Sequence, residues 1–118
     1  MGPRPDQTHL RAHPRTPFVL CNLGSDRVSY ADEAVYVACH HPNIFLTTAG
    51  GSLPDIREAF RVLGPGRLLF GSGLPAHDPW SQLQMIMSLG DQPPLGVAAG
   101  QADLAAVCGA NLLRLLGV

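Results

Sequence analysis

The sequence predicts an α/β fold with a parallel sheet, on the basis of three observations. Three short apolar segments alternate with stretches of helical periodicity, each apolar segment ends in small or polar residues, and the connections are short. Near-continuous apolar runs of this length are typical of parallel strands that are buried on both faces. Alternation of strands and helices with short connections indicates right-handed βα crossovers. The 118 residues allow one domain with a modest core.

The predicted strands cover residues 17–23, 43–48 and 67–72, which read PFVLCNL, NIFLTT and RLLFGS. The preceding residues, 1–16, are polar and rich in proline. We expect them to be a loose lead-in to a domain that spans residues 17–118.

The first helix is predicted between the first two strands, where Ser29 and Asp32 have the spacing of a helix start signal. Its buried stripe follows the period of one helix face. The stripe consists of Tyr30, Ala34, Val37, Ala38 and His41.

The second helix lies between the second and third strands. Ser52 is its N-cap candidate, Asp55 follows three residues later, and Gly64 is expected to end it. Its buried stripe consists of Ile56, Ala59, Phe60 and Leu63.

Two further helices are predicted after the third strand. Asp78 followed by Pro79 is a typical helix opening. The buried side of the third helix is predicted to be Leu83, Ile86 and Met87, with Trp80 also packed against the fold. The stripe of the last helix, which ends at Gly117, consists of Leu104, Val107, Cys108, Leu112 and Leu115. Asn111, on this helix, is expected to pack against the floor of the fold or a loop and to hydrogen-bond there.

Ligands of such sheets bind at the carboxyl ends of the strands. The loops at that edge are predicted to be residues 22–26, 47–52 and 72–78, and we expect any functional site there.

Three short motifs each allow two interpretations. His77 with Asp78 forms either a metal or acid–base pair, or an exposed imidazole beside a helix cap, and we favour the cap. Residues 50–52, Gly-Gly-Ser, form either an anion cradle or a tight turn, and the turn is favoured. Residues 39–41, Cys-His-His, suit the end of a helix better than a zinc site, because adjacent helical residues point in different directions.

Composition excludes several classes of protein. Charged residues make up 14% of the chain, below the ~25% of an ordinary domain. This low fraction suggests that additional protein covers part of its surface. The net charge of −1 indicates neither a nucleic-acid nor an anionic-membrane partner. No apolar run approaches the ~18 residues of a membrane helix, and the first residues lack the apolar stretch of a signal peptide. Cys21, Cys39 and Cys108 lie in apolar segments, so we expect buried, reduced thiols and a cytoplasmic location.

Four segments, HPRTPFVLCNLGS, HPNIFLTTAGG, RLLFGSGLPAHDP and GANLLRLLG, together resemble the amidohydrolase-related family of metal-dependent hydrolases and decarboxylases. The resemblance runs from about His13 to Val118, in the family's order and spacing. It implies a partial (β/α)8 TIM barrel that comprises the last three parallel βα units and a C-terminal helix. A whole barrel has eight strands in about 250 residues.

The resemblance also implies what has changed at the site. The family holds a divalent metal, typically zinc, with paired histidines on the first strand and a ligand on the fifth, and this sequence has no counterpart of those segments. The sixth-strand His of the family aligns with Asn22, and the Asp after FGS aligns with Gly73. Because a glycine can neither bind a metal nor accept a proton, we predict no catalytic residue and no metal ligand in this chain. Asn22, Ser72, Gly73 and His77 are predicted to line the rim of a substrate pocket.

The implied function is therefore that of the C-terminal part of an amidohydrolase-like enzyme, which cleaves C–N or C–O bonds or removes carboxyl groups. We expect the isolated chain to be inactive, with the remaining barrel segments or a second copy as partner and a small-molecule substrate once the barrel is complete. One alternative is a non-catalytic remnant or assembly module that pairs through its open sheet edges. Another is a small α/β module that binds an anion at residues 50–52.

Overall fold

The computed structural model describes residues 12–21 and 30–117. Strands and helices alternate in the predicted order, and the last helix is divided by one π turn. The elements are β1 (Phe18–Leu20), α2 (Tyr30–His40), β2 (Ile44–Thr47), α3 (Leu53–Leu63), the 3-10 turn η1 (Pro65–Arg67), β3 (Leu68–Leu69), α4 (Pro79–Met87), the 3-10 turn η2 (Ser88–Gly90), α5 (Gln101–Ala105), the π turn η3 (Ala106–Ala110) and α6 (Asn111–Leu116).

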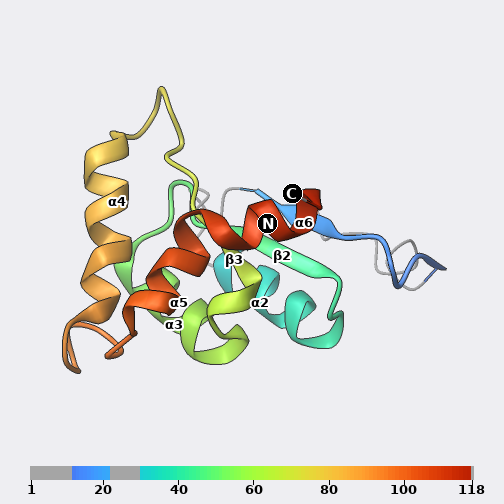
Figure 1. Ribbon diagram of the computed structural model, residues 1–118, viewed down its shortest axis with the longest axis horizontal. Coiled ribbons are helices and arrows are strands. Elements are labelled where there is room, and N and C mark those ends of the chain that lie inside the picture. The colour runs from blue at the N-terminus through green and yellow to red at the C-terminus, as the bar shows by residue number, and fades with distance from the viewer. Residues whose placement is uncertain (1–11, 22–29, 118) are drawn as a thin grey trace.

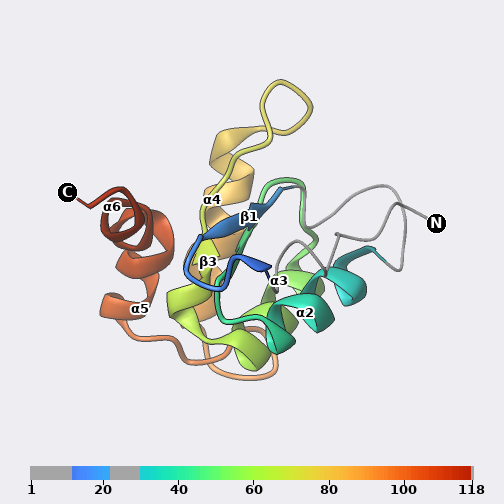
Figure 2. The ribbon, with the colours of Figure 1, turned by 90° about the vertical axis from the view of Figure 1, so that its right-hand side faces the viewer.

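The three strands form one parallel sheet, as predicted, and lie in the order β1-β2-β3. Phe18 lies opposite Ile44 at one end of the sheet, and Thr47 lies opposite Leu69 at the other. Figure 1 shows α4 standing at one side of the molecule, with the loop before it extending away from the sheet. Figure 2 shows α5 and α6 together on one side, with α2 and α3 on the other. The parallel arrangement brings the carboxyl ends of the strands to one edge.

Local end signals place α3 as the sequence predicts. The Ser52 hydroxyl accepts a hydrogen bond from the Asp55 N–H at 3.3 Å, which caps the first turn. At the other end, Gly64 has φ +82° and its N–H donates to the Phe60 carbonyl at 2.8 Å. A residue with a Cβ is strained at such a φ, so glycine suits this helix end.

The core lies between the sheet and its helices. Its large, fully buried side chains include Ile44 and Leu46 from β2, Leu68 from β3, Ile56 from α3 and Ile86 from α4. The predicted stripe of α2 is buried at Ala34, Val37, Ala38 and His41, which confirms that face of the helix. The predicted start signal at Ser29 lies outside the described residues.

Burial on both faces, predicted for all three strands, holds for β2 and β3 but is wrong for β1. The side chain of Val19 is 42% exposed, on the face of β1 opposite to the half-buried Phe18 and Leu20.

The predicted buried side of α4 is also partly wrong. Met87 is 46% exposed, whereas Gln82 and Ile86 are buried and Leu83 is half-buried. The face that contacts the core is centred on positions four residues apart, 82 and 86, and Met87 lies beside it. Trp80, expected to pack, is 68% exposed, because the first turn of α4 extends beyond the sheet.

The buried face of the last helical segment consists of Leu104, Val107 and Asn111, while Cys108 and Leu112 are exposed, contrary to prediction. Cys21 and Cys39 are exposed too, so the expectation of buried thiols is wrong for all three cysteines. Each lies within an apolar segment of the sequence, but Cys39 and Cys108 are on exposed sides of α2 and η3, and Cys21 follows the end of β1.

Arg67 ties the end of α2 to the start of β2. Its Nε donates to the carbonyl of Ile44 at 2.7 Å, and its Nη2 donates to the carbonyls of Ala38 at 2.8 Å and His41 at 2.9 Å. Loss of hydration lowers the pKa of the Arg67 guanidinium, and nearby Cys39 acts in the opposite direction. The rigid, planar group presents several N–H donors at once, which suits three carbonyls that converge from two elements.

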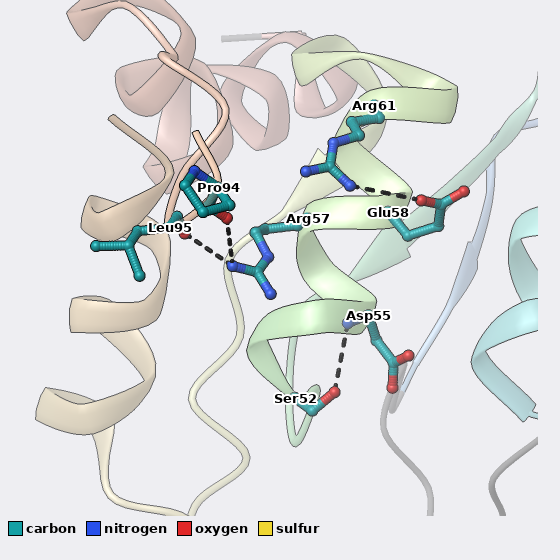
Figure 3. A network of polar contacts seen from close by, with 7 residues as sticks. All are labelled: Ser52, Asp55, Arg57, Glu58, Arg61, Pro94 and Leu95. Carbon is teal, nitrogen blue, oxygen red and sulfur yellow. Dashed lines mark hydrogen bonds and ion pairs between the residues drawn. The ribbon is translucent and has the colours of Figure 1, made fainter. Parts of the chain in front are cut away.

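Arg67→Lys should therefore lower the free energy of unfolding by about 2 kcal/mol, because an ammonium group cannot reproduce the fork and leaves carbonyls without a donor. Urea unfolding followed by circular dichroism measures the effect. Arg61→Lys is the matched control, since the Arg61 side chain is 52% exposed and forms a 3.9 Å ion pair with Glu58 at the surface (Figure 3). Equal losses from the two variants would contradict the role given to Arg67.

Candidate functional site

The loops after β2 and β3 meet at the carboxyl edge of the sheet. The Gly71 N–H donates to the Thr48 hydroxyl at 3.3 Å. A Cβ placed on Gly71 would lie 3.0 Å from the Cβ of Ala49, and one placed on Gly73 would lie 3.4 Å from the Gly50 nitrogen. The two loops are therefore in direct contact, as expected for this edge. The third predicted loop, with Asn22, lies outside the described residues.

His77 lies against Gly73 and covers it. The His77 N–H donates to the Gly73 carbonyl at 3.1 Å, which folds the loop back over the end of β3. Gly73 has φ +75°, and a Cβ placed there would lie 2.9 Å from His77 Cδ2. The imidazole thus occupies the space that a side chain at residue 73 would need.

The other polar groups of this loop have local partners. The Ser72 hydroxyl accepts the Leu74 N–H at 3.4 Å. Asp78 caps α4, because its Oδ2 accepts both the N–H and the hydroxyl of Ser81 at 3.0 Å. The cap interpretation of Asp78 is confirmed.

The Gly-Gly-Ser turn after β2 uses its own polar groups. The Gly51 N–H donates to the Thr48 carbonyl at 3.0 Å, and the Ser52 hydroxyl caps α3 (Figure 3). These bonds are those of a tight turn followed by a capped helix, which is the favoured interpretation.

Residues 39–41 form the end of α2. His40 Nδ1 lies 2.9 Å from the Tyr36 carbonyl, and the His41 carbonyl accepts from Arg67. His41 is buried while Cys39 is exposed, so these side chains point apart. Within residues 12–21 and 30–117, no three His, Cys, Asp or Glu side chains converge to form a metal site. In the described part of the rim, the His77 imidazole lies against Gly73 and the Asp78 carboxylate is engaged in capping α4.

One apolar pocket of about 280 Å³ lies at the other end of α4, lined by Met87, Gln101, Leu104, Ala105 and Cys108. Partial burial raises the pKa of the Cys108 thiol. Sequence reasoning missed this pocket because its lining comes from two helices that no shared motif links.

Replacing Gly73 with Asp tests whether the rim can regain the family's carboxylate. We expect Gly73→Asp to cost about 2 kcal/mol of unfolding free energy, because the left-handed φ alone costs 1–2 kcal/mol for an L-residue and the side chain meets His77. The His77→Ala/Gly73→Asp double variant should recover part of that loss. Thermal unfolding of the two single variants and the double variant measures this coupling. If the losses of the two single variants summed to the loss of the double variant, His77 would not obstruct a side chain at residue 73.

Comparisons with known proteins agree on one family. Residues 6–118 match the family described as Amidohydrolase. The crystal structure of an amidohydrolase from Burkholderia multivorans with bound HEPES is similar, with a TM-score of 0.68 and 15% identity, over 95% of this chain and 48% of that one. No curated protein sequence gives a match.

Two structures of 2,6-dihydroxybenzoate decarboxylase, one in complex with 2,6-dihydroxybenzoate and one from Rhizobium, each have a TM-score of 0.63 and 16% identity. Each alignment covers 92% of this chain and 36% of the decarboxylase. The chain thus spans between about a third and a half of the length of these solved structures. In the described parts of the chain, no helix has both the length and the apolarity to cross a membrane. The parallel α/β fold and the match over residues 6–118 lead to the same conclusion: the chain belongs to the amidohydrolase family.

Proposed function

We propose that this chain supplies the closing βα units of an amidohydrolase-type barrel and forms one wall of its small-molecule pocket. The contact between the loops after β2 and β3, with His77 folded over Gly73, carries the proposal. Barrel enzymes bind their ligands on this edge of the sheet. The extent of the structural alignments, 36% to 48% of each neighbour, supports a partial barrel.

In this proposal the chain lines the pocket, and it does not supply the groups that carry out the chemical step. Gly73 brings no side chain to the end of β3, and the carboxylate of Asp78 is engaged in capping α4. His77 is exposed, so its imidazole can offer a hydrogen bond or exchange a proton with a bound molecule. The groups that perform hydrolysis or decarboxylation then come from segments outside the described residues.

Metal analysis and an activity screen of the purified chain test the proposal. We expect no stoichiometric zinc or manganese, and no turnover of ester, amide or 2,6-dihydroxybenzoate substrates. A chimera in which residues 17–118 replace the aligned part of the Burkholderia amidohydrolase tests the pocket directly. We expect this chimera to fold and to bind small carboxylic acids more weakly after His77→Ala. Stoichiometric metal together with turnover by the chain alone would refute the proposal.

The alternative of an assembly module has one supporting observation. β1 forms an edge of the described sheet and exposes Val19, and exposed strand edges pair readily. Size-exclusion chromatography separates the two candidates, because an assembly module forms a defined oligomer without any other protein. The anion-binding alternative gains no support, since the Gly51 N–H and the Ser52 hydroxyl are already bonded.

A further inference from the structure

The edge of β3 that faces away from β2 is bonded to a helix. The Leu69 carbonyl points toward β2, where it accepts the Thr48 N–H at 2.9 Å. Successive residues of a strand direct their backbone groups to opposite sides. The carbonyl of Leu68 and the N–H of Phe70 therefore point away from β2, along the outer edge of the sheet.

Both outward groups have partners in the C-terminal helical segment. The Phe70 N–H donates to the Val107 carbonyl of η3 at 2.9 Å. The Asn111 Nδ2 donates to the Leu68 carbonyl at 2.9 Å and to the Pro65 carbonyl at 2.6 Å. Asn111 is 1% exposed, so water does not compete for these bonds. Figure 2 shows this segment beside β3.

The π turn makes the first of these bonds possible. In a regular α-helix the Asn111 N–H would bond to the Val107 carbonyl, four residues earlier. Here it bonds to the Ala106 carbonyl, five residues earlier. The Val107 carbonyl is thereby released from its helical partner and accepts the Phe70 N–H instead.

We propose that η3 and α6 act as an edge cap, which occupies the outer edge of β3 in place of a neighbouring strand. Asn111 is the residue that holds the cap closed. An unbonded strand edge is a template for pairing with another chain, and the cap removes that template at β3. A strand that joins the sheet at β3 must first displace the bonds of Val107 and Asn111. The proposal describes the chain on its own: in the barrel of the proposed function, a strand from another segment would take this edge and the cap would have to open.

Hydrogen exchange of backbone amides in the wild-type chain tests the cap directly. We expect the Phe70 amide to be protected within about tenfold of the Thr48 amide, which lies between two strands. Exchange of Phe70 on the order of 100-fold faster than Thr48 would show that the edge is open and would overturn the proposal.

The variant Asn111→Asp separates the cap from general stability. Its side chain has the same shape but cannot donate to Leu68 when ionised. The control is Ile56→Ala, which removes a fully buried side chain of α3. The urea concentration is adjusted for each variant so that the two have the same free energy of unfolding. We expect Asn111→Asp to accelerate exchange at Phe70 at least about tenfold more than at Thr48, and Ile56→Ala to accelerate both alike.

Sedimentation velocity gives the second readout. At matched stability, Asn111→Asp should self-associate at a lower protein concentration than Ile56→Ala, because it exposes the β3 edge. Equal association and equal acceleration of the two amides would refute the cap. If Asn111→Asp does not fold, the wild-type ratio of Phe70 to Thr48 exchange decides the question alone.

Discussion

Asn111→Asp is expected to lower the free energy of unfolding by about 3–5 kcal/mol at neutral pH, the range found when a buried charge is left without a partner. The wild-type amide donates to two carbonyls, Leu68 and Pro65, and is 1% exposed. The substitution sets a carboxylate oxygen against those two carbonyl oxygens. Two favourable contacts therefore become repulsive ones in a site without access to water.

The loss should depend on pH. The two carbonyls favour the protonated carboxyl, so in the folded variant its pKa lies above the value of about 3.9 for the unfolded chain. A group with a raised folded-state pKa is compatible with folding at low pH and becomes destabilising as pH rises. Urea unfolding at a series of pH values should show a small loss below about pH 4 and a growing loss above it.

Asn43→Asp is the matched control, because the Asn43 amide also donates to two carbonyls, those of His13 at 3.0 Å and Thr16 at 2.9 Å. These bonds lie at the surface, so water can solvate the new carboxylate. We expect a loss of about 1 kcal/mol. If the two variants lost equal stability, burial would not be the cause of the effect at Asn111.

The second large effect is expected at Gly96, where Gly96→Ala should cost about 3 kcal/mol. Gly96 is buried, and a Cβ built on it would overlap the backbone carbonyls of Asp91 and Ser88. Neither carbonyl can move freely, since the Ala98 N–H bonds to Asp91 and the Asp91 N–H bonds to Ser88. Backbone atoms cannot rotate away as the end of a side chain can.

The loop that contains Gly96 is also hydrogen-bonded to α3. Arg57 Nη1 donates to the carbonyls of Pro94 at 3.0 Å and Leu95 at 2.9 Å (Figure 3). Displacing Gly96 would strain these bonds as well, so the loop has little room to adapt.

Gly109→Ala provides the control for Gly96→Ala. Apart from its chain neighbours and the backbone of its own helix, no atom of the described residues lies within 4 Å of a Cβ built on Gly109, which belongs to the helical segment η3. We expect a gain of about 0.5–1 kcal/mol, because alanine favours helices over glycine. Thermal unfolding of the two variants should therefore shift in opposite directions, and a loss of similar size in both would contradict the argument.

The parts of the fold that the sequence predicts well depend on local chemistry. Ser52 and Asp78 cap their helices through their own side chains, and Gly64 and Gly117 end helices with positive φ. The parallel direction of the strands follows from the alternation of elements. That Asn111 forms hydrogen bonds was also predictable, although its partners are the carbonyls of Pro65 in η1 and Leu68 in β3. Each of these signals lies within a few residues of the structure it specifies.

The errors arise where contacts between distant segments decide the outcome. Periodicity could not distinguish Met87 from Gln82 on α4, because only the position of the sheet determines which side is buried. The π turn has no local signal either, since the bond that it permits joins Val107 to Phe70, a residue distant in the sequence. At the rim, the resemblance identified Gly73, but the covering of Gly73 by His77 depends on how the loop folds back.

The exposure of Trp80 affects how these variants should be studied. It is the only tryptophan of the chain, and 68% of it is exposed in the folded state. Its indole ring is already largely hydrated, so the wavelength of its fluorescence emission maximum should change little when the chain unfolds. The emission wavelength is therefore a poor measure of unfolding for this chain. It is instead a sensitive probe of any molecule or subunit that covers the first turn of α4.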